Sequence, residues 1–390
     1  MLRHIDRLNL QKRLHQSTSQ YPVTLVLGAR QTGKTELCRA FASSPDHYFD
    51  LERTTDAVRL TDNAQSVLGA LAGCVIIDEA QELPELFSTL RVLADRPEKP
   101  ARFIVTGSVS PTLLTAVSES LAGRASIIEI GGLDLSEVEP DHWKKLWLRG
   151  GHPPSFLAPS DAQAYEWREN YLSLLIGRDL RIWSRSDLKP AQVRKLLEIV
   201  ADSCGQAWNH SAAANVLDLS YKTIQSYVET LKGAYLIREL QPFETNIRKR
   251  IRRSPTLLLR DTGIMHNLLR IRSASHLESH PRRGFSWEAF CTDQIIRLAA
   301  LREENCFRWS VQGGAEVDLV IELPGRRIGA EFKTSDAPKL TESMRSGRDV
   351  LGLNKLFVIF PGDVRFAMDE KIEAVGISRL PELCGEISQV

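Results

Sequence analysis

Short apolar runs alternate with helical stretches along the first third of the chain. Residues 23–27, 74–77, 102–105 and 126–130 are rich in branched and aromatic apolar side chains, and polar or glycine-containing turns bound them. Such runs are typical of buried β-strands. Because helical segments separate them, they predict an α/β fold with a parallel sheet.

The middle of the chain is helical in pattern before it returns to strands. Residues 143–187 show helical periodicity, interrupted by a Gly- and Pro-rich turn. Two short helices, 209–216 and 221–231, are joined by a tight turn, which is the signature of a helix-turn-helix. Strands at 234–240 and 255–259 flank a basic run. This order predicts a winged helix.

The last third of the chain predicts a second α/β region. A helical pattern opens at residue 287 and runs to about residue 301, and alternating apolar positions follow at 316–322 and 328–333. Gly325-Arg326 makes a turn between these two strands, so they form a hairpin. The apolar run 355–360 continues the predicted sheet.

Composition indicates an ordinary globular protein. Hydrophobic residues make up 43% of the chain and charged residues 25%, with a net charge of +1. This balance argues against a uniformly basic DNA-coating protein but allows local basic patches. The six cysteines are scattered without a Cys-x-x-Cys pair, so neither a zinc site nor a disulfide framework is indicated. No apolar run reaches membrane-span length, and we expect a cytoplasmic protein without a membrane partner.

The most specific chemical motif follows the first strand. Residues 28–35 fit the G-x-x-x-x-G-K-[ST] pattern without a gap. The glycines let backbone amides curl around an anion, and the following helix adds its positive end. We predict that ATP and Mg²⁺ bind here, with Lys34 between the β- and γ-phosphates and the Thr35 hydroxyl on the metal. The predicted nucleotide-binding residues are Gly28, Ala29, Arg30, Gln31, Thr32, Gly33, Lys34, Thr35 and Glu36.

The ends of the later strands supply candidate catalytic groups. Asp78 is predicted to orient Mg²⁺ and Glu79 to polarise the attacking water, unless the pair only caps a helix. Thr106 or Ser108 would reach the γ-phosphate or that water, because strand ends of a parallel sheet converge on the ligand; a simple turn is the alternative. Arg124 would stabilise phosphoryl charge in its own or a neighbouring subunit, or is a surface arginine.

These motifs, in this order, resemble a broad prokaryotic family of AAA-type ATPases. The segments that carry the resemblance are "GARQTGKT", "VIIDEAQELPELF", "FIVTGSVSP" and "LAGR". "DLSEVE" is similar to the family's "PLSxxE" pattern, with Leu133-Asp134 where the family usually has Tyr/Leu-Pro. The resemblance implies an oligomeric ATPase core, a winged helix and a C-terminal restriction-endonuclease-like domain, but no settled biological role.

The predicted winged helix suggests contact with nucleic acid. Lys222 and Thr223 would point outward from the second helix, where a major groove could be read. Residues 248–253 contain five basic residues in six, which suits phosphate contact at a hairpin tip. Packing against a neighbouring protein is the alternative. The predicted DNA-binding residues are Lys222, Thr223, Arg248, Lys249, Arg250, Arg252 and Arg253.

The C-terminal hairpin brings acidic residues together in the prediction. Asp318 and Glu331 would lie side by side, with Lys333 on the face of Glu331 and Glu288 reaching in from the helix. This is the D…ExK arrangement of restriction-endonuclease-like folds, in which carboxylates bind a divalent ion and the lysine orients water. A plain ion pair between Asp318 and Lys333 is the alternative.

Three functional hypotheses follow from these patterns. The first is an oligomeric ATPase, most simply a hexameric ring, that remodels or translocates DNA such as branched DNA, with Arg124, Arg178 or Arg181 acting in trans. The second is a slow ATPase switch that gates a partner protein in signalling or defence. The third is an ATP-regulated, Mg²⁺-dependent nuclease. The predicted domains are an ATPase core at 1–140, a helical region with the winged helix at 141–270, and the nuclease-like domain at 271–390.

Overall fold

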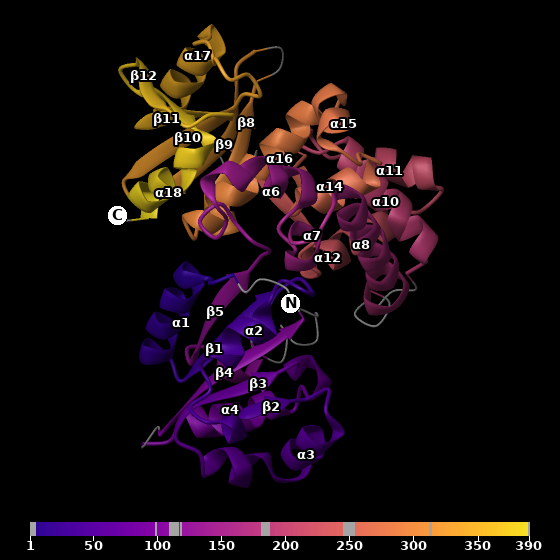
Figure 1. The fold of residues 1–390 in the computed structure, drawn as a ribbon, viewed down its shortest axis with the longest axis vertical. Helices are drawn as coiled ribbons and strands as arrows, with labels where there is room; N and C mark the ends of the chain where they lie inside the picture. The colour runs from indigo at the N-terminus through magenta and orange to yellow at the C-terminus, as the bar shows by residue number, and fades with distance from the viewer. Residues whose placement is uncertain are drawn as a thin grey trace. The chain divides into compact units, whose positions relative to one another are not determined.

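The structure, a computed structural model, describes residues 5–97, 100–108, 117, 119–180, 188–244, 254–311 and 314–388. The chain divides into two units. The first comprises residues 1–132, with 179–187 and 233–235, and the second comprises the remainder. Each unit contains one sheet (Figure 1).

The first unit is built on a five-stranded sheet in the order β2-β3-β4-β1-β5, and every neighbouring pair is parallel. The predicted α/β class is therefore confirmed. Its strands are β1 Val23–Gly28, β2 Tyr48–Asp50, β3 Gly73–Asp78, β4 Ala101–Ser108 and β5 Ala125–Ile130. Its helices are α1 Leu8–Gln20, α2 Lys34–Arg39, α3 Thr54–Gly69 and α4 Leu86–Ala94, with short 3-10 turns η1 Pro45–His47 and η2 Ala80–Glu82.

Both faces of this sheet are covered, which explains why its strands read as continuous apolar runs. Side chains alternate along β1, so Leu25 joins the core on one face and Val26 the core on the other. Helices α3 and α4 cover the face that contains Leu25. Helices α1 and α2 cover the face that contains Val26. The carboxyl ends of β1, β3 and β4 consequently meet at one edge.

The second unit contains a mixed eight-stranded sheet in the order β12-β13-β11-β10-β9-β8-β6-β7. Its strands are β6 Ile237–Pro242, β7 Thr256–Leu259, β8 Cys306–Ser310, β9 Glu316–Leu323, β10 Arg326–Phe332, β11 Lys355–Phe360, β12 Arg365–Asp369 and β13 Ile372–Gly376. Strand β6 pairs with β8, so one sheet includes strands from both the predicted middle and C-terminal regions. The predicted boundary near residue 270 stays a prediction.

The second unit also contains many helices. They are α6 Trp143–Arg149, α7 Pro153–Phe156, α8 Asp161–Leu174, α10 Pro190–Asp202, α11 His210–Leu217, α12 Tyr221–Gly233, α14 Thr262–Leu268, α15 Ala274–Ser279, α16 Arg283–Leu298, α17 Glu342–Leu351 and α18 Leu380–Ser388, with shorter turns η3 Pro140–His142, η4 Leu175–Asp179, η5 Glu303–Asn305 and η6 Ile377–Arg379. Helices α6 and α16 pack through Trp147 and Trp287, whose ring centroids are 4.9 Å apart. Edge-to-face aromatic pairs of this kind add to the apolar burial.

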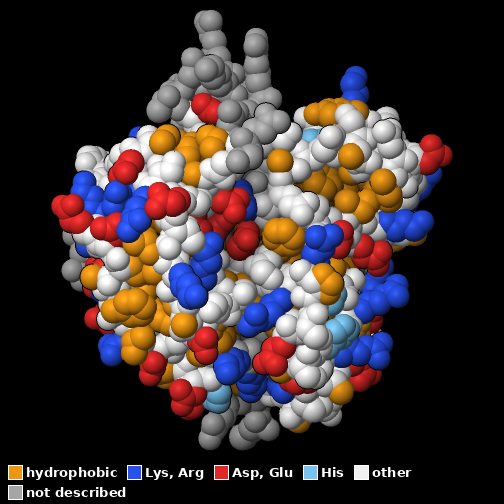
Figure 2. Space-filling model, turned by 90° about the horizontal axis from the view of Figure 1, so that it is seen from above, with side chains coloured by type: hydrophobic (Ala, Val, Ile, Leu, Met, Phe, Trp, Pro, Cys, Tyr) orange, Lys and Arg blue, Asp and Glu red, His pale blue; other side chains and the backbone are white. Residues whose placement is uncertain are grey.

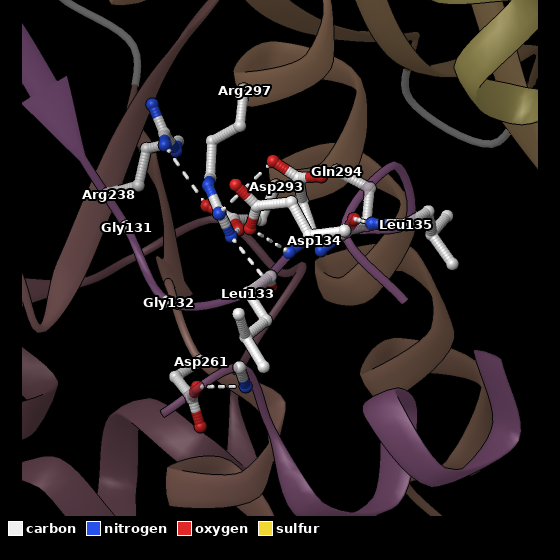
Figure 3. A network of polar contacts seen from close by, with 12 residues as sticks. Gly131, Gly132, Leu133, Asp134, Leu135, Arg238, Asp261, Asp293, Gln294 and Arg297 are labelled. Carbon is white, nitrogen blue, oxygen red and sulfur yellow. Dashed lines mark hydrogen bonds and ion pairs between the residues drawn. The ribbon is translucent and has the colours of Figure 1, made fainter. Parts of the chain in front are cut away.

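A network of ion pairs connects the segment at Asp134, near the start of the second unit, to α16 (Figure 3). Arg238 of β6 pairs with Asp293 of α16 at 3.1 Å. Asp293 also accepts a hydrogen bond from Arg297 at 3.3 Å, and Arg297 lies 3.6 Å from Asp134. Because each of these charges has an opposite partner, removal of one member would leave an uncompensated charge, which is strongly destabilising.

The "DLSEVE" segment has a structural role in this network. The Asp134 carboxylate accepts from the Ser136 backbone amide at 2.9 Å, and the Glu137 carboxylate accepts from the Asp134 amide at 3.1 Å. The Leu135 amide donates to Gln294 at 2.8 Å. Side chains of the segment therefore accept hydrogen bonds from its own backbone amides, and the Leu135 amide attaches it to α16.

On the face drawn in Figure 2, the basic and acidic side chains of the described residues intermingle. This agrees with the net charge of +1. Within the described residues, no helix combines the length and the apolar character needed to cross a bilayer.

We expect Gly28→Ala to destabilise the first unit. A Cβ at this position would overlap the Ile130 carbonyl oxygen, a backbone atom of the neighbouring paired strand that cannot move aside easily. Overpacking of this kind costs about 1–3 kcal/mol. Thermal unfolding followed by circular dichroism should show a lower midpoint. Gly69→Ala, whose Cβ would have no neighbour closer than 3.8 Å, is the matched control and should keep or raise the midpoint. Equal midpoints for Gly28→Ala and the parent would contradict this view of the β1–β5 contact.

Candidate nucleotide site and a second acidic cluster

The predicted phosphate loop connects the end of β1 to the start of α2. Gly33 has φ of +89° and directly precedes the helix, and Gln31 has φ of +57°. Positive φ at two positions turns the chain sharply between the strand and the helix. Thr32 is buried, and its hydroxyl donates to the Ala29 carbonyl at 2.9 Å. The loop thus has the tight, helix-capped form that an anion-binding turn requires.

Lys34 is buried with its ammonium group inside this loop. Its Nζ donates to the carbonyl oxygens of Gly28 at 3.0 Å and Ala29 at 2.7 Å. Burial lowers the pKa of Lys34, while the nearby charges of Glu79 and Asp78 oppose that shift. A buried cation whose partners are mainly backbone carbonyls fits a site that accepts an anion.

Asp78 ends β3 at the edge where the loop lies. Its carboxylate accepts a hydrogen bond from the Tyr48 hydroxyl at 2.6 Å and another from the Thr106 hydroxyl. Arg39 of α2 donates to the Tyr48 hydroxyl at 3.3 Å. Two hydroxyl donors from β2 and β4 therefore fix the orientation of this carboxylate. Thr106 contacts Asp78 in this arrangement rather than pointing freely toward a ligand.

Glu79 follows Asp78 in an unusual backbone conformation. Its φ is +56°, which is uncommon for a residue with a side chain. Gln81 donates to its carboxylate at 2.5 Å. Burial raises the pKa of Glu79, although the Gln81 hydrogen bond and the charge of Lys34 oppose the shift. A half-buried carboxylate of raised pKa next to a phosphate loop is suited to accept a proton.

Arg7 completes the loop, although no sequence pattern pointed to it. This buried side chain donates to the Thr32 carbonyl at 2.9 Å. It also donates to the carbonyls of Gly131 at 3.2 Å and Gly132 at 2.7 Å, just beyond β5. One guanidinium therefore ties the loop to the end of the neighbouring strand. A single arginine before a helix has no motif around it, so no sequence signal identifies it.

Arg124 lies away from the loop within the same chain. It precedes β5, and its carbonyl accepts from the amide of Val23, at the opposite end of β1 from Gly28. A strand of this length at about 3.3 Å per residue separates the two ends by roughly 16 Å. The Arg124 side chain forms two hydrogen bonds to Asp95, at 2.6 and 2.9 Å. A role in its own phosphate site is therefore geometrically remote, and action on a neighbour stays a prediction.

The other residues predicted to act at the phosphate site belong to β4, to α2 and to the chain near η4. Ser108 ends β4 beside Gly28, but its side chain is outside the described part of the structure. Thr35 is half-buried in the first turn of α2, and Arg178 is exposed in the π-helical turn η4. Arg181 lies outside the described residues.

The predicted nuclease-like residues do come together in the second unit. Glu288 is on α16, Asp318 on β9 and Glu331 on β10, while Lys333 follows β10. Lys333 contacts Glu331 at 3.0 Å. Asp318 accepts from the Phe332 amide at 2.9 Å. Burial raises the pKa of Glu331 to about 8 and that of Glu288 to about 7, with the charge of Asp318 adding to both shifts.

Arg308 is a member of this cluster that no sequence pattern indicated. From β8 it reaches Glu288 at 3.0 Å, Asp318 at 3.5 Å and Glu316 at 3.6 Å. Among the described residues, no group of three or more acidic, histidine or cysteine side chains is arranged to hold a metal ion. The residues present therefore do not fit a resident divalent ion, because a guanidinium already lies among the carboxylates.

The predicted helix-turn-helix corresponds to α11 and α12. Ser220 caps α12 by accepting from the Thr223 amide at 3.1 Å. Ile224, Val228 and Leu231 are buried, as their spacing predicts. Lys222 is exposed, whereas the Thr223 hydroxyl contacts that of Ser220 at 2.8 Å. The predicted basic residues Arg248, Lys249, Arg250, Arg252 and Arg253 lie outside the described part of the structure.

The parallel sheet, the glycine loop and the acidic strand end together are those of a P-loop fold. A family model described as an AAA domain matches residues 20–139. Two models described as domains of unknown function match residues 140–275 (DUF8612) and 283–380 (DUF4143).

Two curated relatives place the whole chain in a family. The uncharacterized proteins Rv2008c of Mycobacterium tuberculosis and Mb2031c of Mycobacterium bovis are each 41% identical to it over 373 residues. The match covers 95% of this chain and 83% of each relative. The chain therefore belongs to the family of these mycobacterial proteins, with an AAA domain in its N-terminal part.

Comparison with solved structures gives weaker likenesses. The Walker-type ATPase PABY2304 of Pyrococcus abyssi is 19% identical, with a TM-score of 0.46 over 68% of this chain and 96% of that one. AMPPCP-bound DnaA of Aquifex aeolicus is 15% identical, with a TM-score of 0.29 over 58% of this chain and 87% of that one.

We expect Arg7→Ala to weaken binding of a fluorescent ATP analogue by roughly tenfold, because hydrogen bonds from a charged donor to the loop would be lost. The measurement is a fluorescence titration of folded protein. Lys12→Ala, at an exposed position on α1, is the matched control and should bind like the parent. An unchanged affinity in Arg7→Ala would show that the loop does not depend on this guanidinium.

Proposed function

We propose that this chain is an ATP-hydrolysing AAA-type ATPase that acts on DNA as an oligomer. One observation carries the ATPase part of the proposal. The buried ammonium of Lys34 lies in a glycine loop, and the acidic end of β3 is close enough for the charges of Asp78 and Glu79 to act on it. Cation, amide turn and carboxylates at one sheet edge are the parts that phosphoryl transfer needs.

The position of each residue around the loop suggests its role in ATP hydrolysis. The backbone amides of residues 28–35 would surround the phosphates, and Lys34 would exchange its two carbonyl partners for phosphate oxygens. Thr35 and Asp78 would hold Mg²⁺, which when bound neutralises phosphate charge and polarises the transferred group. Glu79 would orient the attacking water and accept its proton, a role that its raised pKa supports.

The DNA part of the proposal rests on the second unit. Helices α11 and α12 are joined by a short turn, and the exposed residues of α12 include Lys222. In a winged helix this second helix would enter a groove, while the basic run 248–253 would contact phosphates. The net charge of +1 agrees with local contact rather than coating of DNA.

The oligomer would supply the missing arginine. Arg124 is remote from its own loop, while its exposed pairing with Asp95 leaves it at a sheet edge where a neighbouring subunit could present a phosphate. Arg178 and Arg181 are the other proposed candidates. An arginine provided in trans would make hydrolysis depend on assembly.

We expect ATP hydrolysis by the parent to be stimulated by DNA. The ATPase rate should be compared with no DNA and with single-stranded, duplex and branched DNA. Lys34→Ala should lower kcat/KM by at least roughly 100-fold, because it removes a charge that acts on the transferred phosphoryl group. Lys195→Ala, which removes an exposed lysine on α10, is the matched control and should hydrolyse ATP like the parent.

Three outcomes separate the hypotheses. If Lys34→Ala hydrolyses ATP like the parent, the loop assignment fails. A slow ATPase that no DNA stimulates, isolated with a bound protein, would favour the switch that gates a partner. A DNA-stimulated rate supports the proposal, and the most effective DNA form identifies the substrate.

Lys222 offers a separate test of DNA contact. If its ammonium contacts a phosphate, Lys222→Ala should reduce the slope of log affinity against log salt concentration by about one unit. Fluorescence anisotropy with labelled duplex DNA at several salt concentrations measures this slope. The exposed Lys195 again provides the control variant. A parent and a Lys222→Ala variant with equal slopes would remove α12 from the proposed DNA surface.

A further inference from the structure

The acidic cluster of the second unit contains a cation of its own. Arg308 lies between α16 and β9, with one guanidinium nitrogen 3.0 Å from Glu288. The other terminal nitrogen lies 3.5 Å from Asp318 and 3.6 Å from Glu316. The arginine side chain is only 16% exposed, so it is enclosed by these acids rather than held loosely at the surface.

We infer that Arg308 occupies the place of a divalent metal in this cluster, and that the second unit is a packing or binding module closed to Mg²⁺ while Arg308 is in place. Magnesium and manganese ions need several oxygen ligands at about 2.0–2.2 Å. A guanidinium among the same oxygens excludes the ion by space and by like charge.

The remaining oxygens leave little for a metal. One oxygen of Asp318 accepts from the Phe332 amide and the other faces Arg308. One oxygen of Glu331 contacts Lys333, and its other oxygen is buried without a hydrogen-bond partner. A Cβ at Gly205 would lie 2.9 Å from the Glu288 oxygen that Arg308 contacts, so the backbone is close to this pair as well. Both oxygens of Asp318 are already engaged, so a metal ion could reach them only by displacing Arg308 or the Phe332 amide.

Removal of Arg308 should make the carboxylates of the cluster available to a metal ion. Four carboxylates, from Glu288, Glu316, Asp318 and Glu331, would then face one remaining cation, Lys333. Such a cluster has a strong demand for positive charge, and the guanidinium would leave a space lined by oxygens. Arg308→Gln should therefore create a site for a divalent ion that the parent lacks.

The test is a titration of nucleotide-free, EDTA-treated full chain with Mn²⁺, followed by electron paramagnetic resonance of the free ion. The parent should bind no Mn²⁺ through Asp318, and Arg308→Gln should gain one site at least about tenfold tighter than any site of the parent. The double variant Arg308→Gln with Asp318→Asn should lose that site. Arg345→Gln, at an arginine on α17 that pairs with Asp369, is the matched control and should gain none.

Two results would overturn the inference. The first is Mn²⁺ binding by the parent that Asp318→Asn abolishes, because the cluster would then hold a metal beside Arg308. The second is a folded Arg308→Gln chain, verified by circular dichroism, that gains no site. If Arg308→Gln does not fold, the parent and Asp318→Asn still decide the question. The outcome does not depend on whether the first unit hydrolyses ATP.

Discussion

The first unit is organised around a positive charge buried against its own backbone. The ammonium of Lys34 cannot remain dehydrated without partners, and the loop turns two carbonyl oxygens toward it. That geometry requires the sharp turn at Gln31 and Gly33, and it requires the end of β5 to stay close, which Arg7 enforces. The negative charges of Asp78 and Glu79 at the end of β3 also act on this ammonium group. An incoming phosphate would satisfy the same charge, so the arrangement is ready for an anion.

The two units solve the problem of buried charge in opposite ways. In the first, the cation is held by neutral carbonyls, which an anion can replace at small electrostatic cost. In the second, Arg308 is held by three carboxylates, and its departure would leave uncompensated negative charge. The first arrangement is suited to binding an anionic ligand, whereas in the second the carboxylates already have a cationic partner. This contrast explains why we propose ligand binding for the Lys34 loop and a closed site for the Arg308 cluster.

The sequence predicted what depends on neighbouring residues. The loop 28–35 and the strand end at Asp78 are local patterns, and the parallel order of the sheet follows from strands separated by helices. It also predicted the buried face of α12 from helical spacing. Contacts between distant residues escaped it: Arg7 contacts Gly131 across 124 positions, and Tyr48 contacts Asp78 across 30. Arg308 escaped because an arginine inside a strand shows no sign of facing acids on two other elements. Arg124 was expected near a phosphate from the order of the motifs alone, but it precedes β5, and the start of a parallel strand lies at the edge of the sheet opposite the loop.

The most direct test of the central claim is an experimental map of the chain with Mg²⁺ and a non-hydrolysable ATP analogue. The account predicts a triphosphate enclosed by the amides of residues 28–35, with Lys34 Nζ moved from the Gly28 and Ala29 carbonyls to phosphate oxygens and Asp78 facing the metal. A nucleotide bound elsewhere, or Lys34 still bonded to those carbonyls beside it, would contradict the account.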